Sequence, residues 1–135
     1  MIRVVLIIFV LYSCNARHKS EYIEVVSKAD KLNIVYTSDH YYDTTINFTT
    51  ELRKSFQNFF ESKDEQCRCV VTGRLRFYSS SKIILVADFT IDKKENNGDD
   101  CESLVVFPSE YVCYSLNYNV GIFLSEIYAD LNRAK

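Results

Sequence analysis

The sequence predicts an α+β fold, in which a three-stranded antiparallel sheet is covered by a C-terminal helix, stapled by disulfides and preceded by a strand-helix extension. Three observations predict it. Short apolar, β-branched runs alternate with turn-rich segments late in the chain, apolar residues at helical spacing follow them, and four of the five cysteines lie beyond residue 64. Strands that follow one another with short connections are expected to form an antiparallel meander.

The first residues have the pattern of a secretory signal peptide. Arg3 precedes an apolar run from Val4 to Leu11, and small residues follow up to Ala16. The run is too short to cross a bilayer. We therefore expect a signal peptide over residues 1–16 and a secreted protein without stable membrane insertion. A second route stays open, since the segment around Cys14 loosely resembles a bacterial lipoprotein cleavage box.

Residues 17–63 are predicted to form the N-terminal extension. The apolar, β-branched run Leu32–Thr37 favours a strand. Thr49 and Thr50 offer N-cap oxygens, and the residues that follow predict an amphipathic helix over Glu51–Ser62. The apolar positions at helical spacing are Leu52, Phe56, Phe59 and Phe60. We interpret the helix as part of a core, because its polar face is short and only weakly basic.

Residues 64–135 are predicted to form the disulfide-stapled domain. An irregular stretch over Val70–Ser81 is followed by a strand over Lys82–Ile91 and a charged, turn-rich segment over Asp92–Asp100. Two further strands are expected, and they are separated by a turn. The second strand is Leu104–Phe107, the turn is Pro108–Glu110 and the third strand is Tyr111–Tyr114.

The chain ends in a predicted amphipathic helix that covers the sheet. Its cap is Asn117 or Asn119, and its apolar residues fall on one helical face. These residues are Val120, Phe123, Leu124, Ile127, Tyr128 and Leu131.

Removal of Cys14 with the leader leaves an even number of cysteines, which in a short exported chain predicts two disulfides. Four cysteines allow three pairings. A Cys67–Cys69 bridge would close a strained ring, so each of these two is expected to join a different partner downstream, Cys101 or Cys113. An oxidising compartment and the Cys-x-Cys spacing both disfavour a zinc site.

Composition excludes several function classes. The net charge of −2 shows no strong basic balance that would indicate nucleic acid binding. The two histidines lie in no catalytic or metal-binding motif, and no phosphate loop or nucleophile elbow is present. We therefore expect no enzyme, no cofactor and no bound metal. The triplet that begins at Asn47 is a sequon, so a glycoprotein is expected where the host glycosylates exported chains.

From Gln66 to Lys135 the order of features resembles the CXC chemokine family: Cys67-Arg68-Cys69, a loop, a strand, a turn-rich loop ending at Cys101, a second strand, and Cys113 followed by a helix. The resemblance implies a secreted chemokine-like cytokine or immune modulator that binds a G-protein-coupled chemokine receptor, as agonist or antagonist. It also implies Cys67–Cys101 and Cys69–Cys113 disulfides. A divergent, virus-encoded member would suit the long segment ahead of Cys67.

The same resemblance implies contacts with partners. Receptor-binding residues would lie beside the first cysteine and in the loop that follows, at Gln66, Arg68, Arg74, Arg76, Phe77 and Tyr78. Glycosaminoglycan would meet Lys82, Lys93 and Lys94 through clustered positive charge. That binding is expected to be weak, because the terminal helix carries Glu126 and Asp130. The resemblance is also compatible with a homodimer.

A second hypothesis comes from another class. In it the whole exported chain is one α+β extracellular adhesion or structural domain, or a lipoprotein, without a signalling role. The strand and helix of the first half then pack onto the same sheet, and Ile46–Ile91 resembles the strand and helix order of the SEA domain.

Overall fold

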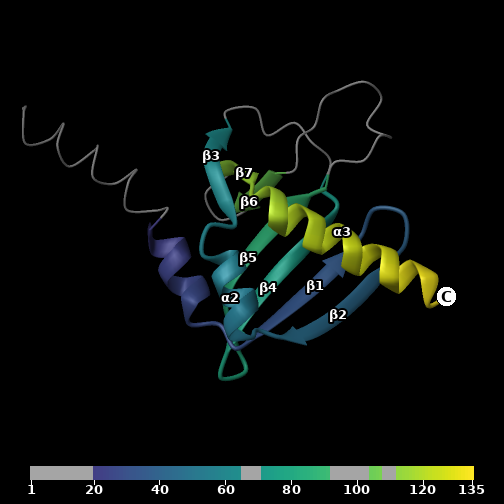
Figure 1. Ribbon diagram of the computed structural model, residues 1–135, viewed down its shortest axis with the longest axis horizontal. Coiled ribbons are helices and arrows are strands. Elements are labelled where there is room, and N and C mark those ends of the chain that lie inside the picture. The colour runs from purple at the N-terminus through teal and green to yellow at the C-terminus, as the bar shows by residue number, and fades with distance from the viewer. Residues whose placement is uncertain (1–19, 65–70, 92–103, 108–111) are drawn as a thin grey trace, which may run out of the picture.

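A single antiparallel sheet runs through the protein, with helices across one of its faces (Figure 1). The computed structural model describes residues 20–64, 71–91, 104–107 and 112–135. Residues 20–27 are helical. The other elements are β1 (Lys31–Tyr36), β2 (Tyr42–Asn47), α2 (Thr50–Phe56), β3 (Phe60–Asp64), β4 (Gly73–Ser79), β5 (Lys82–Thr90), β6 (Leu104–Phe107), β7 (Val112–Leu116) and α3 (Tyr118–Arg133).

The α+β class, the antiparallel sheet and the C-terminal helix are confirmed, but the predicted number of strands is wrong. The strand order is β2-β1-β4-β5-β6-β7-β3, a seven-stranded sheet. The three predicted strands are β5, β6 and β7, which are neighbours as a meander requires. β4 and β1 extend the sheet beyond β5, and β3 pairs with β7 at the other end. The first half of the chain therefore contributes β1, β2 and β3 to this same sheet.

The core lies between the sheet and the helices. Alternate residues of β1, Leu32, Ile34 and Tyr36, are fully buried on this face, as the two-residue period of a strand requires. α3 adds Val120 and Leu124 from above. Aromatic rings fill much of the space between the layers, and the buried phenylalanines among them are Phe48, Phe56, Phe59, Phe60, Phe77, Phe89 and Phe107.

The helix predicted over Glu51–Ser62 ends at Phe56, so its second half is a correction. Its start agrees with the sequence, because the Thr49 hydroxyl caps it by accepting a 3.2 Å bond from the Leu52 amide. After a turn, the chain continues as β3, whose Phe60 lies opposite Leu116 of β7. The apolar spacing correctly predicted that the aromatic residues are buried, but it indicated a helix. The backbone of Phe60–Asp64 forms its hydrogen bonds with β7 and is therefore a strand.

The stretch Val70–Ser81, predicted to be irregular, contains β4. This strand pairs with β1 on one side and β5 on the other. Ser80 and Ser81, at φ 49° and 66°, form the two-residue turn to β5. Turns of this left-handed kind match the twist of the paired strands. The Ser80 amide donates to Asp30 Oδ2 at 2.9 Å and so ties the turn to the residue before β1.

α3 agrees with the prediction at its cap and along its apolar face. Asn117 Oδ1 accepts from the Asn119 amide at 2.9 Å. The buried Tyr36 hydroxyl donates to the Leu124 carbonyl at 2.6 Å, which fastens β1 to the middle of the helix. Burial raises the pKa of Tyr36 well above its usual range. Among the described residues, no helix combines the length and apolar character needed to cross a bilayer.

Candidate functional site

The opposite face of the sheet carries no described helix, and we call it the helix-free face. Its side chains are the alternate residues of each strand, set in rows by the register. One row runs Val35, Arg74 and Asp88 across β1, β4 and β5. The next row places Asn33 opposite Arg76. Residues two apart on a strand are about 7 Å apart, so the two arginines stand side by side.

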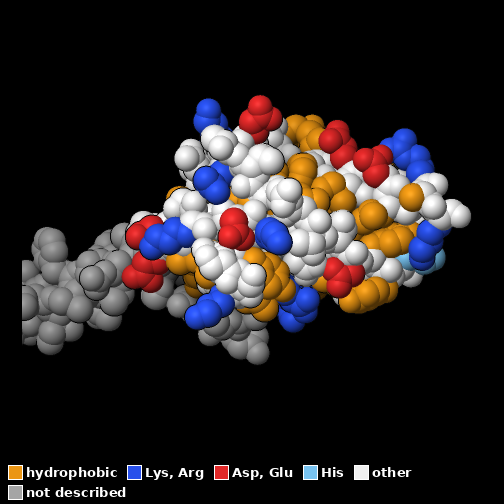
Figure 2. All heavy atoms as spheres, turned by 90° about the horizontal axis from the view of Figure 1, so that it is seen from below, with side chains coloured by type: hydrophobic (Ala, Val, Ile, Leu, Met, Phe, Trp, Pro, Cys, Tyr) orange, Lys and Arg blue, Asp and Glu red, His pale blue; other side chains and the backbone are white. Residues whose placement is uncertain are grey.

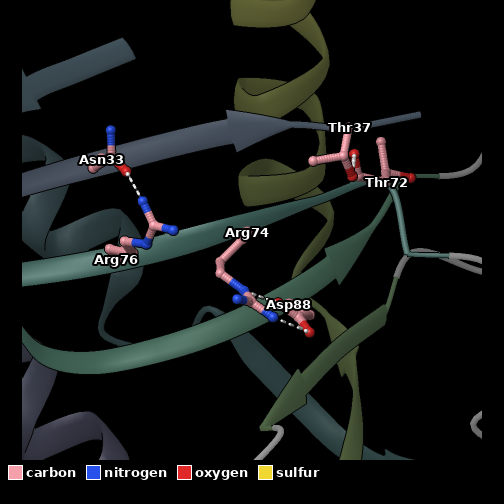
Figure 3. Close-up of polar contacts among 6 residues, drawn as sticks. All are labelled: Asn33, Thr37, Thr72, Arg74, Arg76 and Asp88. Atoms are coloured by element: carbon pink, nitrogen blue, oxygen red, sulfur yellow. Dashed lines mark hydrogen bonds and ion pairs between the residues drawn. The ribbon is translucent and has the colours of Figure 1, made fainter. Parts of the chain in front are cut away.

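Arg74 is held by its neighbour on β5. Its Nε donates to Asp88 Oδ1 at 2.6 Å and its Nη2 to Asp88 Oδ2 at 3.3 Å (Figure 3). The hydrogen bond, and then the charge of this carboxylate, raise the pKa of Arg74, and slight desolvation opposes them. The Arg74 side chain is 45 % exposed, so the pair stabilises the fold by at most about 1 kcal/mol. Its main effect is to neutralise and orient the guanidinium.

Arg76 is held by an amide instead of a carboxylate. Its Nη1 donates to Asn33 Oδ1 at 3.4 Å. Asn33 is only 5 % exposed, and its Nδ2 lies 2.5 Å from Asp43 Oδ1, 3.1 Å from Thr45 Oγ1 and 3.2 Å from the Thr44 carbonyl oxygen. The Asn33 amide is thereby fixed with its oxygen toward β4. Arg76 forms no ion pair with any residue that the structure describes.

A pocket of about 310 Å³ opens on this face beside the arginines. Charged, polar and apolar groups all line it. The lining residues are Val35, Thr37, Tyr41, Val71, Gly73, Arg74, Arg76 and Asp88. Tyr41 and Val71 are 68 % and 38 % exposed, so apolar surface stays open at the rim.

One wall of the pocket is fastened by two threonines at the ends of β1 and β4. The Thr37 amide donates to the Thr72 carbonyl at 2.9 Å, and the Ile91 amide donates to Thr72 Oγ1 at 3.1 Å. Gly73 lets the strands approach, because a Cβ there would lie 2.2 Å from the Val35 carbonyl oxygen. The pocket therefore rests on a rigid part of the sheet.

The structure brings together only part of the predicted receptor site. Arg74 and Arg76 lie at the pocket, on a strand and not in the predicted loop. Tyr78 is half-buried near the end of β4. Phe77 is fully buried in the core and faces the helices, so it presents nothing to a partner. Gln66 and Arg68 lie outside the described residues.

The predicted glycosaminoglycan and glycan sites lie apart from the pocket. Lys82 begins β5 and is exposed, whereas Lys93 and Lys94 lie outside the described residues. Figure 2 shows Lys and Arg side chains interspersed with Asp and Glu on the surface seen from below, with no single positive cluster there. Asn47, the sequon residue, is exposed at the end of β2.

Cys113 is buried in β7 opposite Val106 and is disulfide-bonded. Cys67, Cys69 and Cys101 lie outside the described residues. The predicted Cys67–Cys101 and Cys69–Cys113 pairing therefore stays a prediction.

Sequence reasoning missed Asn33, Asp43 and Asp88, which hold the arginines in place. A signal was present, since β4 alternates polar and apolar residues from Arg74 to Phe77 as a half-buried strand does. Opposite-charge pairs across neighbouring strands are stabilising, so acidic partners for two arginines on one face could have been sought in the adjacent strands.

The part of the chain that the structure describes holds no group of three His, Cys, Asp or Glu side chains able to bind a metal ion. The arrangement instead offers fixed hydrogen-bond donors beside open apolar surface. No protein-family model, no curated protein and no solved structure matches this chain.

Proposed function

We propose that the protein is an exported, non-catalytic binding protein that engages its partner through the helix-free face. The observation that carries the proposal is the pocket beside Arg74 and Arg76, where oriented guanidinium groups adjoin the exposed ring of Tyr41. Arginine and tyrosine are the side chains that most often dominate binding energy at protein interfaces. Here both residue types line one pocket on a hydrogen-bonded sheet.

Preorganisation of the arginines supports this role. A free arginine side chain loses about 0.5–1.5 kcal/mol of conformational entropy when a partner immobilises it. Arg74 and Arg76 are already held by Asp88 and Asn33, so much of that cost is met in the fold. Placement on paired strands also keeps the donors in a fixed register.

Export is supported by the leader pattern of residues 1–16 and by the disulfide at Cys113. Disulfides persist in oxidising compartments and are rare in the cytosol. The second hypothesis drawn from the sequence is an extracellular adhesion or structural domain without a signalling role, and the helix-free face would be the binding site of an adhesion domain.

Flow cytometry of the fluorescently labelled, secreted chain on a panel of cell types tests the proposal. The variants are Arg76→Ala and Tyr41→Ala at the pocket, with Glu126→Ala on α3 as the exposed control. We expect saturable binding whose affinity falls at least about thirtyfold in the pocket variants and is unchanged in the control, since loss of a hot-spot side chain costs about 2 kcal/mol or more. Equal binding by all variants, or no saturable binding on any cell type, would contradict it.

A chemokine-type receptor ligand is the second candidate. The observation that favours it is the order of β5, β6, β7 and α3, three consecutive antiparallel strands followed by a helix, with a disulfide-bonded cysteine in β7. The test is calcium flux and ligand competition on a chemokine receptor panel. A response or competition that Arg74→Ala weakens would support this candidate, and silence throughout the panel would count against it.

A further inference from the structure

We infer that the pocket on the helix-free face binds a single carboxylate carried next to an apolar or aromatic group. The inference rests on the proposed function of that face and names the chemistry it recognises. A carboxylate of this kind occurs at the C-terminus of a protein that ends in an apolar residue, and also in a free aromatic acid.

The charge of the pocket favours one negative charge. Arg74 is neutralised by Asp88 at 2.6 Å. Arg76 donates only to the neutral Asn33 amide among the described residues. Asp43 is the nearest carboxylate in that network, and it bonds to the far side of the same amide. Among the described residues the pocket thus holds one guanidinium whose charge no carboxylate pairs, which suits a single carboxylate and not a dianionic phosphate.

The geometry of Arg76 favours a planar acceptor. A guanidinium presents five N–H donors in a flat fork that matches the two oxygens of a carboxylate. Nη1 is directed to Asn33, and Figure 3 shows the Arg76 side chain reaching toward β1 while Arg74 reaches toward Asp88 on β5. The other donors of Arg76 have no partner among the described residues, and its half-buried side chain lines the pocket.

The rest of the lining favours an apolar substituent. Val35 is 5 % exposed and lies in the same row as Arg74, while Tyr41 and Val71 stand at the rim with open apolar surface. A volume of about 310 Å³ is at the lower end for ligand sites, so it holds one residue-sized group. Such a group would cover the three side chains while its carboxylate meets Arg76.

Four probes test the chemistry by NMR titration of the isotope-labelled full chain: N-acetylphenylalanine, its uncharged amide, 3-phenylpropionate and inorganic phosphate. We expect the two acids to bind with a dissociation constant on the order of 1–10 mM, as suits one ion pair and one small apolar contact. The amide resonances of β1 and β4 beside the pocket should shift. The uncharged amide and phosphate should bind at least about tenfold more weakly, because the first lacks the charge and the second the apolar group.

Comparing the affinities of the two acids identifies the source of the carboxylate. Tighter binding of N-acetylphenylalanine indicates a protein C-terminus, because only this probe carries the preceding peptide group. Equal or tighter binding of 3-phenylpropionate indicates a free acid. Either result supports the inference.

Two variants and one control test the residues. Arg76→Gln should weaken binding of both acids about tenfold, the loss expected for one hydrogen-bonded charge. Asp88→Asn should strengthen it about two- to fivefold, because it frees Arg74 at the cost of an exposed ion pair. Arg133→Gln, on the exposed end of α3, is the matched control and should change nothing.

The inference is overturned if the amide binds as well as its acid, if phosphate binds more tightly than both acids, or if Arg133→Gln and Arg76→Gln have equal effects. The proposed function would still stand after such a result if Arg76→Ala and Tyr41→Ala weaken binding to cells. If the pocket variants bind cells as well as the parent protein does, while the acids still bind in the pocket, the proposed function alone is overturned.

Discussion

The hydroxyl of Tyr36 gives a prediction in which the sign of a mutational effect reverses with pH. It donates to the Leu124 carbonyl at 2.6 Å inside the core. At pH 8 the substitution Tyr36→Phe removes this bond, so we expect it to lower the free energy of unfolding by about 1 kcal/mol. The Leu124 carbonyl belongs to α3, whose backbone ladder still satisfies it, so the loss should not be larger.

Alkaline pH should reverse the order of the two proteins. Burial raises the pKa of Tyr36 in the folded state, whereas in the unfolded chain it stays near 10. Above pH 10 only the unfolded chain releases this proton, so the folded state loses stability as pH rises. At pH 11 the loss is about 1.4 kcal/mol for this one group. The phenylalanine variant lacks this loss, so the two stabilities should cross between about pH 10 and 11.

Urea unfolding of both proteins from pH 8 to pH 11, followed by circular dichroism, measures the crossing. The other tyrosines are the same in both proteins, so their effects cancel in the difference. Tyr118→Phe is the control, because Tyr118 is 79 % exposed and its substitution should change stability by less than about 0.5 kcal/mol. A constant difference between Tyr36→Phe and the parent protein over this range would refute the reasoning.

Three further substitutions test the fold around the site. Ser81→Gly should raise the free energy of unfolding by about 0.5–1 kcal/mol, because glycine adopts φ 66° without a Cβ penalty; an unchanged thermal midpoint would contradict the turn. Gly73→Ala should destabilise by about 2 kcal/mol or more, since its Cβ would lie 2.7 Å from Phe89 Cζ and closer still to backbone; urea unfolding measures it. Asn117→Ala should lower the free energy of unfolding by about 1 kcal/mol, because α3 loses its N-cap. An unchanged thermal midpoint would argue against this, even if the helical signal becomes smaller.

The last strands and the terminal helix could be predicted because their sequence patterns leave one interpretation. β6 is the uninterrupted apolar run Leu104–Phe107, and β5 is rich in β-branched residues. α3 repeats apolar residues at helical spacing behind an asparagine cap. Each of these patterns is complete within one short stretch of sequence, so local patterning was enough.

β2 and β3 could not be predicted in the same way, because tertiary pairing decides them. β2 reads Tyr-Asp-Thr-Thr-Ile-Asn, with only Tyr42 buried, because it is the edge strand and one side of it faces water. β3 follows a helix whose apolar spacing continues into Phe59 and Phe60. It becomes a strand because β7 presents an edge there, about fifty residues further along the chain. β2 pairs with the strand just before it, so its polar sequence concealed it, whereas the partner of β3 is not visible in a local window of sequence.

β4 shows why the candidate site was located only in part. Its Gly73, two arginines and the serines that follow are typical of a loop when each is taken singly. Taken as a period of two, Leu75 and Phe77 point inward while Arg74 and Arg76 point to the helix-free face. The residues that concealed the strand are thus the ones that line the pocket. A receptor contact drawn from the loop interpretation would have required Phe77 to be exposed, whereas the strand interpretation assigns it to the core and leaves the arginines, with Asp88 and Asn33 across the ladder, as the groups a ligand can meet.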